Sequence, residues 1–241
     1  MSELDTRNAV IEACRGMNRA GLNQGTSGNV SVRAGNGFLI TPSGVDYDQM
    51  QAEQIVPMDL EGGYWGDWLP SSEWRMHMDI YRAYAAAGAV VHVHSTYATA
   101  LSCLRRDIPA FHYMIAAAGG DSLRCADYAM FGTQELSDAM LVALAGRSAC
   151  LLANHGQICF GADLAKALWL AGEIEALCQQ YFIACQGHLA SNSGSWLLLS
   201  GGDTRHHPHK MRDGPFRACP CCWFLSTSTG ARMRGKHGVL S

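Results

Sequence analysis

The segment AVVHVH at residues 89–94 constrains the fold more than any other part of the chain. Its run of β-branched and small apolar residues predicts a buried β-strand. Because side chains alternate along a strand, His92 and His94 point to the same face, with Cα atoms roughly 6.5–7 Å apart. Two imidazoles in this arrangement can bind one cation at about 2.0–2.1 Å from each ring nitrogen.

A third histidine, His155, follows a second expected strand at 149–153 in the sequence Asn154-His155-Gly156. Three neutral nitrogen ligands with an open fourth position are typical of a catalytic zinc site rather than a structural one. The alternative is three ordinary, partly buried histidines, which would be favoured for an isolated His-x-His pair. The addition of His155 and of Glu73 favours a metal site.

The remaining elements predict one mixed sheet with helices, of the α/β or α+β class. Ser71 or Ser72 is expected to cap the helix that begins at Glu73, and Asp163 the last helix. Helices are expected at about 4–20, 73–87, 97–104, 134–145 and 164–188; strands at 30–33, 37–40, 55–58, 149–153 and 158–160, besides 89–94.

Three loops rich in small polar residues are candidates for binding a phosphate. They are Ser27-Gly28-Asn29, the segment Thr41 to Gly44 that includes Ser43, and Ser71-Ser72. Hydroxyl groups and free backbone N–H groups, especially at a helix start, favour an anion. Plain turn chemistry explains any one of these loops alone, but three of them beside a metal site favour phosphate binding.

Composition excludes several classes of protein. The 241 residues are 48% hydrophobic and 16% charged, which excludes disorder over most of the chain. The first 190 residues show no basic patch, and no apolar stretch reaches about 18 residues, so we expect neither nucleic acid nor membrane as a partner. The N-terminus is not a signal peptide, which predicts a soluble, cytoplasmic protein with reduced cysteines.

Charge divides the chain near residue 190. Residues 1–190 hold 11 Lys and Arg against 19 Asp and Glu, whereas residues 191–241 hold 7 against 2. The second part also contains Cys219-Pro220-Cys221-Cys222, whose spacing with the preceding histidines matches no familiar zinc finger.

Eight segments in order resemble the class II aldolase/adducin family over about residues 5–190. They are GLNQGTSGNVSVR (21–33), LITPSGVDY (39–47), LPSSEWRMH (69–77), VVHVHS (90–95), IPAFHYMIAAAGGDS (108–122), FGTQELS (131–137), NHG (154–156) and KALWLAGEIEALCQQY (166–181). Within the family, the similarity is greatest to aldolases of L-fuculose 1-phosphate. The resemblance implies an α/β fold with a central, mostly antiparallel sheet flanked by helices on both sides.

The resemblance also implies roles for individual residues. His92, His94 and His155 correspond to zinc ligands, and Glu73 to a carboxylate that ligates zinc at rest and acts as acid and base. Tyr113 corresponds to a tyrosine that reaches a neighbouring subunit's site in a homotetramer, and Phe131 to an aromatic at the aldehyde end of the pocket. The phosphate-binding positions are Gly28, Asn29, Ser43, Gly44, Ser71 and Ser72.

The implied reaction is reversible cleavage of a ketose 1-phosphate into dihydroxyacetone phosphate and an aldehyde. The substrate can be L-fuculose 1-phosphate, or 5-deoxyribulose or 5-methylthioribulose 1-phosphate. Lys166 is the only lysine before residue 210 and lies on an expected amphipathic helix, which argues against a Schiff-base aldolase. The alternatives are a pentulose-5-phosphate 4-epimerase of the same family and a non-catalytic adducin-like assembly module, which would bind no metal.

The resemblance places a domain boundary at the change in charge. Residues 1–190 are predicted to form the catalytic domain. Nothing from Ser191 onward matches the family, so our hypothesis is that residues 191–241 are a frame-shifted or unrelated tail without a fold of its own.

Overall fold

The computed structural model describes residues 2–191, and residues up to Phe182 form one compact unit. A second unit begins at Ile183, and of it only the end of one helix is described. Of the predicted tail at 191–241, Ser191 is the last residue of a helix, and residues 192–241 lie outside the described residues.

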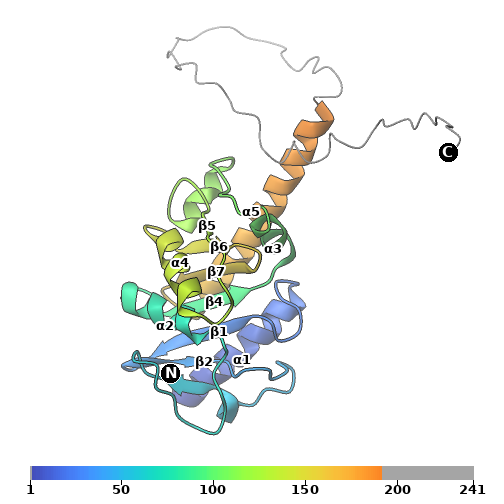
Figure 1. Ribbon diagram of the computed structural model, residues 1–241. Coiled ribbons are helices and arrows are strands. Elements are labelled where there is room, and N and C mark those ends of the chain that lie inside the picture. Colours follow the sequence, from blue (N-terminus) through green and yellow to red (C-terminus); the bar gives the residue numbers. More distant parts are fainter. Residues whose placement is uncertain (1, 192–241) are drawn as a thin grey trace, which may run out of the picture. The chain divides into compact units, whose positions relative to one another are not determined.

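A seven-stranded sheet forms the centre of the compact unit (Figure 1). Its strand order is β3-β2-β1-β4-β7-β6-β5, and every neighbouring pair is antiparallel except β5 and β6, which are parallel. This confirms the predicted mostly antiparallel sheet. The strands are β1 (Asn29–Ala34), β2 (Gly37–Ile40), β3 (Val56–Met58), β4 (Ala89–Val93), β5 (Cys125–Ala126), β6 (Ala149–Leu152) and β7 (Gly156–Gly161).

Helices cover both faces of the sheet, so the unit has three layers (Figure 1). One apolar core lies between the sheet and α1, α3 and the first part of α5, and it includes Val30 and Val91. The second core lies between the opposite face and α2 and α4, and it includes Val90 and Ile158. The helices are α1 (Glu3–Arg19), α2 (Trp74–Ala83), α3 (Thr96–Ser102), α4 (Gln134–Leu144) and α5 (Leu164–Ser191), with short 3-10 helices η1 (Ala52–Gln54) and η2 (Tyr113–Ala118).

The prediction of a serine cap on α2 is wrong. Glu73 occupies the N-cap position, and no side chain caps it. The Ser71 hydroxyl instead accepts a 3.3 Å hydrogen bond from the Glu73 N–H, which holds the turn before the helix. The helix also ends at Ala83 rather than near residue 87, because Tyr84 is already extended.

Strand β5 is a strand that the sequence pattern did not predict. It has two residues, too few for an alternating or continuous apolar pattern to be recognised. Its parallel pairing with β6, through Cys125 opposite Leu151, depends on a neighbour distant in sequence.

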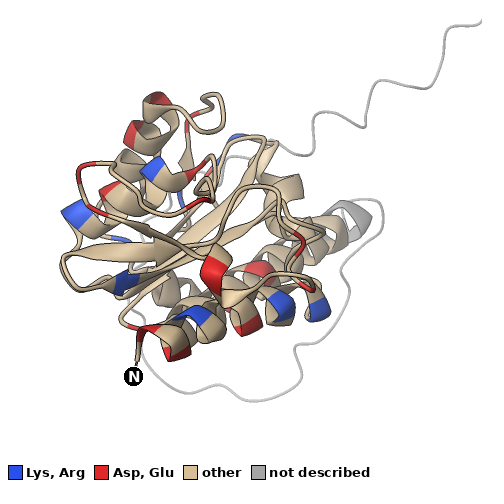
Figure 2. Ribbon diagram, turned by 90° about the horizontal axis from the view of Figure 1, so that it is seen from below, with Lys and Arg blue, Asp and Glu red and all other residues tan. Residues whose placement is uncertain are grey.

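Acidic and basic residues are interspersed over the helices and loops (Figure 2). Among the described residues, no helix is both long enough and apolar enough to cross a membrane.

Candidate metal centre and substrate pocket

The sheet brings the three predicted histidines to one place. His92 lies in β4 opposite Asn29 of β1, and it shares its face with Val90 of the α2-side core. His94 follows the end of β4, with its side chain on that face too. His155 lies in the turn between β6 and β7, directly after Asn154, whose φ of 57° is left-handed. Antiparallel pairing of β4 with β7 places this turn beside the end of β4.

Three of the distances between the ligand atoms are close to those around a tetrahedral ion. His92 Nε2 lies 3.0 Å from His94 Nε2 and 3.1 Å from Glu73 Oε2, and His155 Nε2 lies 3.2 Å from Glu73 Oε1. Tetrahedral ligands at 2.0–2.1 Å from a zinc ion would be about 3.3 Å apart. All four ligand atoms lie within 4.8 Å of one another.

The hydrogen bond on the far side of His92 supports metal binding. Its Nδ1 lies 2.8 Å from the carbonyl oxygen of Gln157, which can only accept a hydrogen bond. Nδ1 therefore carries a proton, so in the neutral imidazole the lone pair lies on Nε2 and faces the cluster. Such a bond to a carbonyl is typical of metal-binding histidines.

Glu73 is a buried carboxylate whose charge is compensated within the cluster. Burial raises its pKa, but His92 and His155 outweigh this effect and hold the pKa well below its usual range. Burial by itself would lower the pKa of the fully buried His92, but Glu73 and the hydrogen bond to the Gln157 carbonyl raise it. Oε1 has no hydrogen-bond partner of good geometry, so a buried lone pair is left for a cation. The residues present thus fit a bound metal.

His94 and His155 are partly exposed and form the open side of the cluster. Burial, followed by the neighbouring His92 and His155, lowers the pKa of His94 to about 3. A neutral imidazole is the form that binds a metal.

A pocket of about 390 Å³ opens onto Glu73, His94 and His155. The other lining residues are Thr26, Ser27, Ser72, Tyr128, Ala129, Phe131 and Asn154. The predicted Ser72 and Phe131 therefore face the same space as the metal cluster. Of the lining residues that sequence reasoning missed, Asn154 was detectable as the neighbour of His155; nothing in the pattern indicated Tyr128.

Two of the loops predicted to bind phosphate, the one from Thr41 to Gly44 and the one at Ser71-Ser72, are joined by backbone hydrogen bonds. Ser43 N–H donates to the carbonyl of Leu69 at 2.9 Å, and Ser71 N–H donates to that of Thr41 at 3.0 Å. The backbone N–H groups of Ser43 and Ser71 therefore already donate hydrogen bonds within the protein. Only the side-chain hydroxyl groups of these two residues are left to bind an anion. Gly44 has a φ of 69°, which a residue with a side chain adopts only with strain.

Asn29 and Gly28 lie beside the cluster for different reasons. Asn29 Nδ2 donates a 3.0 Å hydrogen bond to Glu73 Oε2, so its amide contacts the candidate acid–base group directly. Gly28 permits a close approach of two strands, because a Cβ there would lie 2.7 Å from the His92 carbonyl oxygen.

Tyr113 does not reach the cluster of its own chain. It begins η2, its side chain is 81% exposed, and it is absent from the lining of the pocket at Glu73. Tyr113 could therefore act only at the corresponding site of another subunit.

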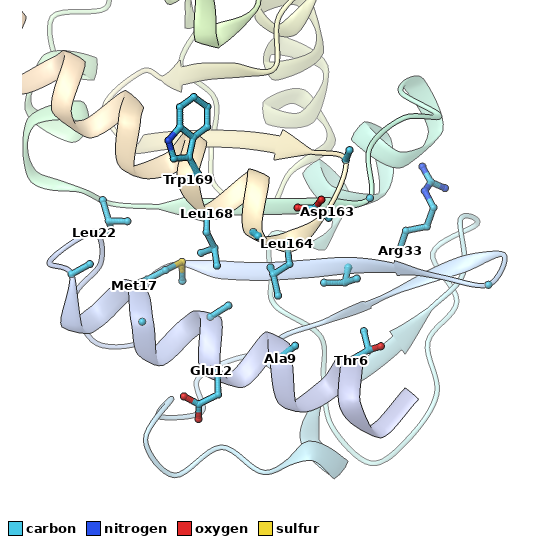
Figure 3. Close-up of a pocket in the computed structure, with 18 residues that line it drawn as sticks. Thr6, Ala9, Glu12, Met17, Leu22, Arg33, Asp163, Leu164, Leu168 and Trp169 are labelled. Atoms are coloured by element: carbon cyan, nitrogen blue, oxygen red, sulfur yellow. The ribbon is translucent and has the colours of Figure 1, made fainter. Parts of the chain in front are cut away.

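A larger pocket, of about 1050 Å³, lies between α1 and the start of α5 (Figure 3). Its lining is mainly apolar, and its charged residues already have structural partners. Glu12 pairs with Arg15, Arg33 donates to carbonyls of Ala87 and Tyr81, and Asp163 caps α5 through the N–H of Lys166. The candidate metal ligands Glu73, His94 and His155 instead line the smaller pocket.

The sequence matches the family model described as class II aldolase and adducin N-terminal domain over residues 8–182. The chain belongs to this family. The match covers every residue of the candidate centre, and it confirms the predicted family and fold.

Individual relatives are aldolases of two substrate groups. The L-fuculose phosphate aldolase of Escherichia coli K12 is 54% identical over 172 residues, which cover 71% of this chain and 80% of the relative. The 5-methylthioribulose-1-phosphate/5-deoxyribulose-1-phosphate aldolase of Rhodospirillum rubrum is 50% identical over 185 residues, covering 77% and 84%. A solved L-fuculose 1-phosphate aldolase superimposes with a TM-score of 0.72 at 39% identity, covering 81% and 90%.

These similarities support the predicted enzyme class, a class II aldolase, over a non-catalytic assembly module. Class II aldolases are metal-dependent, and the cluster of Glu73, His92, His94 and His155 is able to bind a metal.

Proposed function

We propose that the chain is a zinc-dependent aldolase that reversibly cleaves a ketose 1-phosphate into dihydroxyacetone phosphate and an aldehyde. The observation that carries this proposal is the convergence of Glu73, His92, His94 and His155 on the edge of a polar pocket, with their ligand atoms within 4.8 Å of one another. Three neutral histidines and a carboxylate suit zinc among the common divalent metals.

When bound, the zinc supplies a Lewis acid that polarises the substrate oxygens, an effect large enough to move the pKa of water from about 15.7 to about 7. In cleavage, the C3–C4 bond breaks, its electron pair moves towards the C2 carbonyl oxygen, and the C4 hydroxyl loses its proton. Glu73 then delivers a proton to C3, for which its buried position at the pocket is suited. In the reverse direction, Glu73 removes that proton.

The remaining roles follow the resemblance. Gly28, Asn29, Ser43, Gly44, Ser71 and Ser72 bind the phosphate, and Phe131 contacts the aldehyde end. Tyr113 exchanges the proton at the C4 oxygen of a substrate bound to a neighbouring subunit, in a homotetramer. Its high exposure within one chain supports this arrangement.

Metal analysis together with an assay of product tests the proposal. We expect about one zinc per chain in the purified protein, loss of cleavage with a chelator, and recovery on adding zinc. Release of dihydroxyacetone phosphate should be measured in parallel from L-fuculose, 5-deoxyribulose and 5-methylthioribulose 1-phosphates. A protein that binds no metal and cleaves none of the three would contradict the proposal.

A further inference from the structure

Two rows of polar side chains face each other between strand β1 and helix α2. Asn29 and Ser31 alternate with apolar residues on the strand. Glu73, at the N-cap of the helix, is followed at every fourth residue by His77 and Tyr81 within it. Four residues of helix rise about 6.0 Å and two residues of strand about 6.6 Å, so the two rows stay in step. All five residues are buried.

Hydrogen bonds connect the two rows in a continuous chain from Tyr81 to Glu73. Ser31 Oγ lies 2.8 Å from the Tyr81 hydroxyl and 2.7 Å from His77 Nδ1. His77 Nε2 lies 2.6 Å from Asn29 Oδ1, and Asn29 Nδ2 lies 3.0 Å from Glu73 Oε2.

The Glu73 carboxylate at one end of this series of hydrogen bonds decides which group donates and which accepts in each bond. A carboxylate only accepts, so Asn29 must turn its NH₂ group to Glu73 and its Oδ1 to His77. Oδ1 also only accepts, so His77 must carry its proton on Nε2. The unprotonated Nδ1 then accepts from the Ser31 hydroxyl, whose oxygen accepts from Tyr81.

The opposite tautomer of His77 would reverse the Asn29 amide. With the proton on Nδ1, the unprotonated Nε2 would need the NH₂ group of Asn29 as its donor. Oδ1 of Asn29 would then face the Glu73 carboxylate, two acceptors at a distance of 3.0 Å. Because His77 is fully buried, no water compensates for such a mismatch.

We infer that His77 is a positioning residue: its Nε2–H fixes the Asn29 amide so that Asn29 donates to Glu73 and holds that carboxylate in place. The His77 side chain is hydrogen bonded to Ser31 and Asn29 rather than to a metal ligand, and it does not line the pocket at Glu73, so it acts through Asn29. The catalytic consequence rests on the proposed role of Glu73 as the group that moves the proton at C3.

The tautomer can be measured directly on the zinc-loaded, full-length protein. Long-range ¹H–¹⁵N correlation spectra distinguish protonated from unprotonated ring nitrogens, and the signals lost in His77→Gln assign those of His77. We expect a protonated Nε2 and an unprotonated Nδ1. A protonated Nδ1 would overturn the inference.

The kinetics of three variants, compared at equal zinc content, test whether this positioning of Glu73 affects catalysis. His77→Leu removes both hydrogen bonds and should lower kcat/KM about 10–100-fold, the range for groups that orient a metal site from behind. His77→Gln keeps a donor and an acceptor and should recover most of this loss. Tyr81→Phe is the matched control, since Ser31 can still donate to His77, and we expect less than about a twofold change.

Equal losses in His77→Leu and Tyr81→Phe, or no recovery in His77→Gln, would mean that His77 has only a packing role and would overturn the inference. The spectrum does not depend on turnover. If the wild-type protein cleaved no ketose 1-phosphate, the proposed function would fail while the tautomer still tested the orientation of Asn29.

Discussion

Arg105 and Asn154, two non-glycine residues with left-handed backbone, are hydrogen bonded to each other. Arg105 Nε donates to Asn154 Oδ1 at 2.6 Å, and the φ angles are 52° and 57°. The Asn154 N–H also donates to the carbonyl of Ser102 at 3.2 Å, and the His155 N–H donates to the Ser102 hydroxyl at 3.3 Å. The turn that presents His155 to the metal cluster is therefore attached to the end of α3 and to the loop after it.

Asn154→Ala should destabilise the protein by roughly 1–2 kcal/mol. The substitution removes the acceptor for Arg105 and places a residue with a poor left-handed preference at a positive φ. Because His155 follows directly, zinc affinity should also fall. Urea unfolding and competition with a chelator measure the two effects.

Asn154→Gly is the matched control for that experiment. Glycine accepts the positive φ without strain but also lacks the hydrogen bond. It should therefore lose less stability than the alanine variant, by about 1 kcal/mol. Equal losses in the two variants would show that backbone strain at this turn is unimportant.

Tyr113→Phe should abolish most of the cleavage while leaving stability within about 0.5 kcal/mol, because the side chain is largely exposed. If Tyr113 acts at the site of a neighbouring subunit, combining the Tyr113→Phe variant with the Glu73→Gln variant should restore activity. Hybrid assemblies then contain sites with an intact Glu73 from one chain and an intact Tyr113 from another. Co-expression followed by an assay of the purified hybrids measures this, and hybrids no more active than the separate variants would contradict the shared site.

Lys166→Ala should leave cleavage within about twofold of the wild type. Lys166 is the only lysine among the described residues, and it is exposed near the start of α5, outside the pocket at Glu73. A Schiff-base mechanism needs an amine at the substrate carbonyl. Treatment with borohydride in the presence of dihydroxyacetone phosphate should therefore not inactivate the wild-type protein, and covalent trapping at Lys166 would disprove a purely metal-dependent reaction.

The metal-free protein should lose stability as the pH falls below about 6.5, in part through His77. Burial lowers the pKa of this imidazole to about 3, whereas an unfolded histidine titrates near 6.5. Between these values the unfolded chain takes up a proton that the folded chain does not, so the free energy of unfolding decreases by about 1.4 kcal/mol per pH unit.

His77→Gln should remove the contribution of His77 to the pH dependence of the free energy of unfolding, whereas Tyr81→Phe should retain it. Urea unfolding of the three proteins between pH 4 and pH 7, with chelator present, gives the comparison. An unchanged slope in His77→Gln would show that the imidazole of His77 is charged in the folded protein.

The metal centre was predictable because its residues carry local signals. Alternation along a strand puts His92 and His94 on one face, and His155 follows the end of a second predicted strand. Together with Glu73 these residues favoured a metal site, and the resemblance then implied the role of each. The cap of α2 was not predictable in the same way. A serine before a helix is a common cap. Here, however, the Ser71 N–H donates a hydrogen bond to the Thr41 carbonyl of a distant loop, and the Glu73 carboxylate pairs with His92 and His155.

Periodicity and short motifs, which are properties of neighbouring residues, determined the mixed α/β or α+β class and the ligand types. The resemblance of eight segments determined the family and implied helices on both faces of the sheet. Only the tertiary structure decided how Asn29, Glu73 and His77 combine. These residues come from β1, the turn before α2 and α2 itself, and their hydrogen bonds exist because strand and helix repeats coincide across a packed interface. Directional bonds of this kind depend on distances between elements, which a linear pattern does not contain.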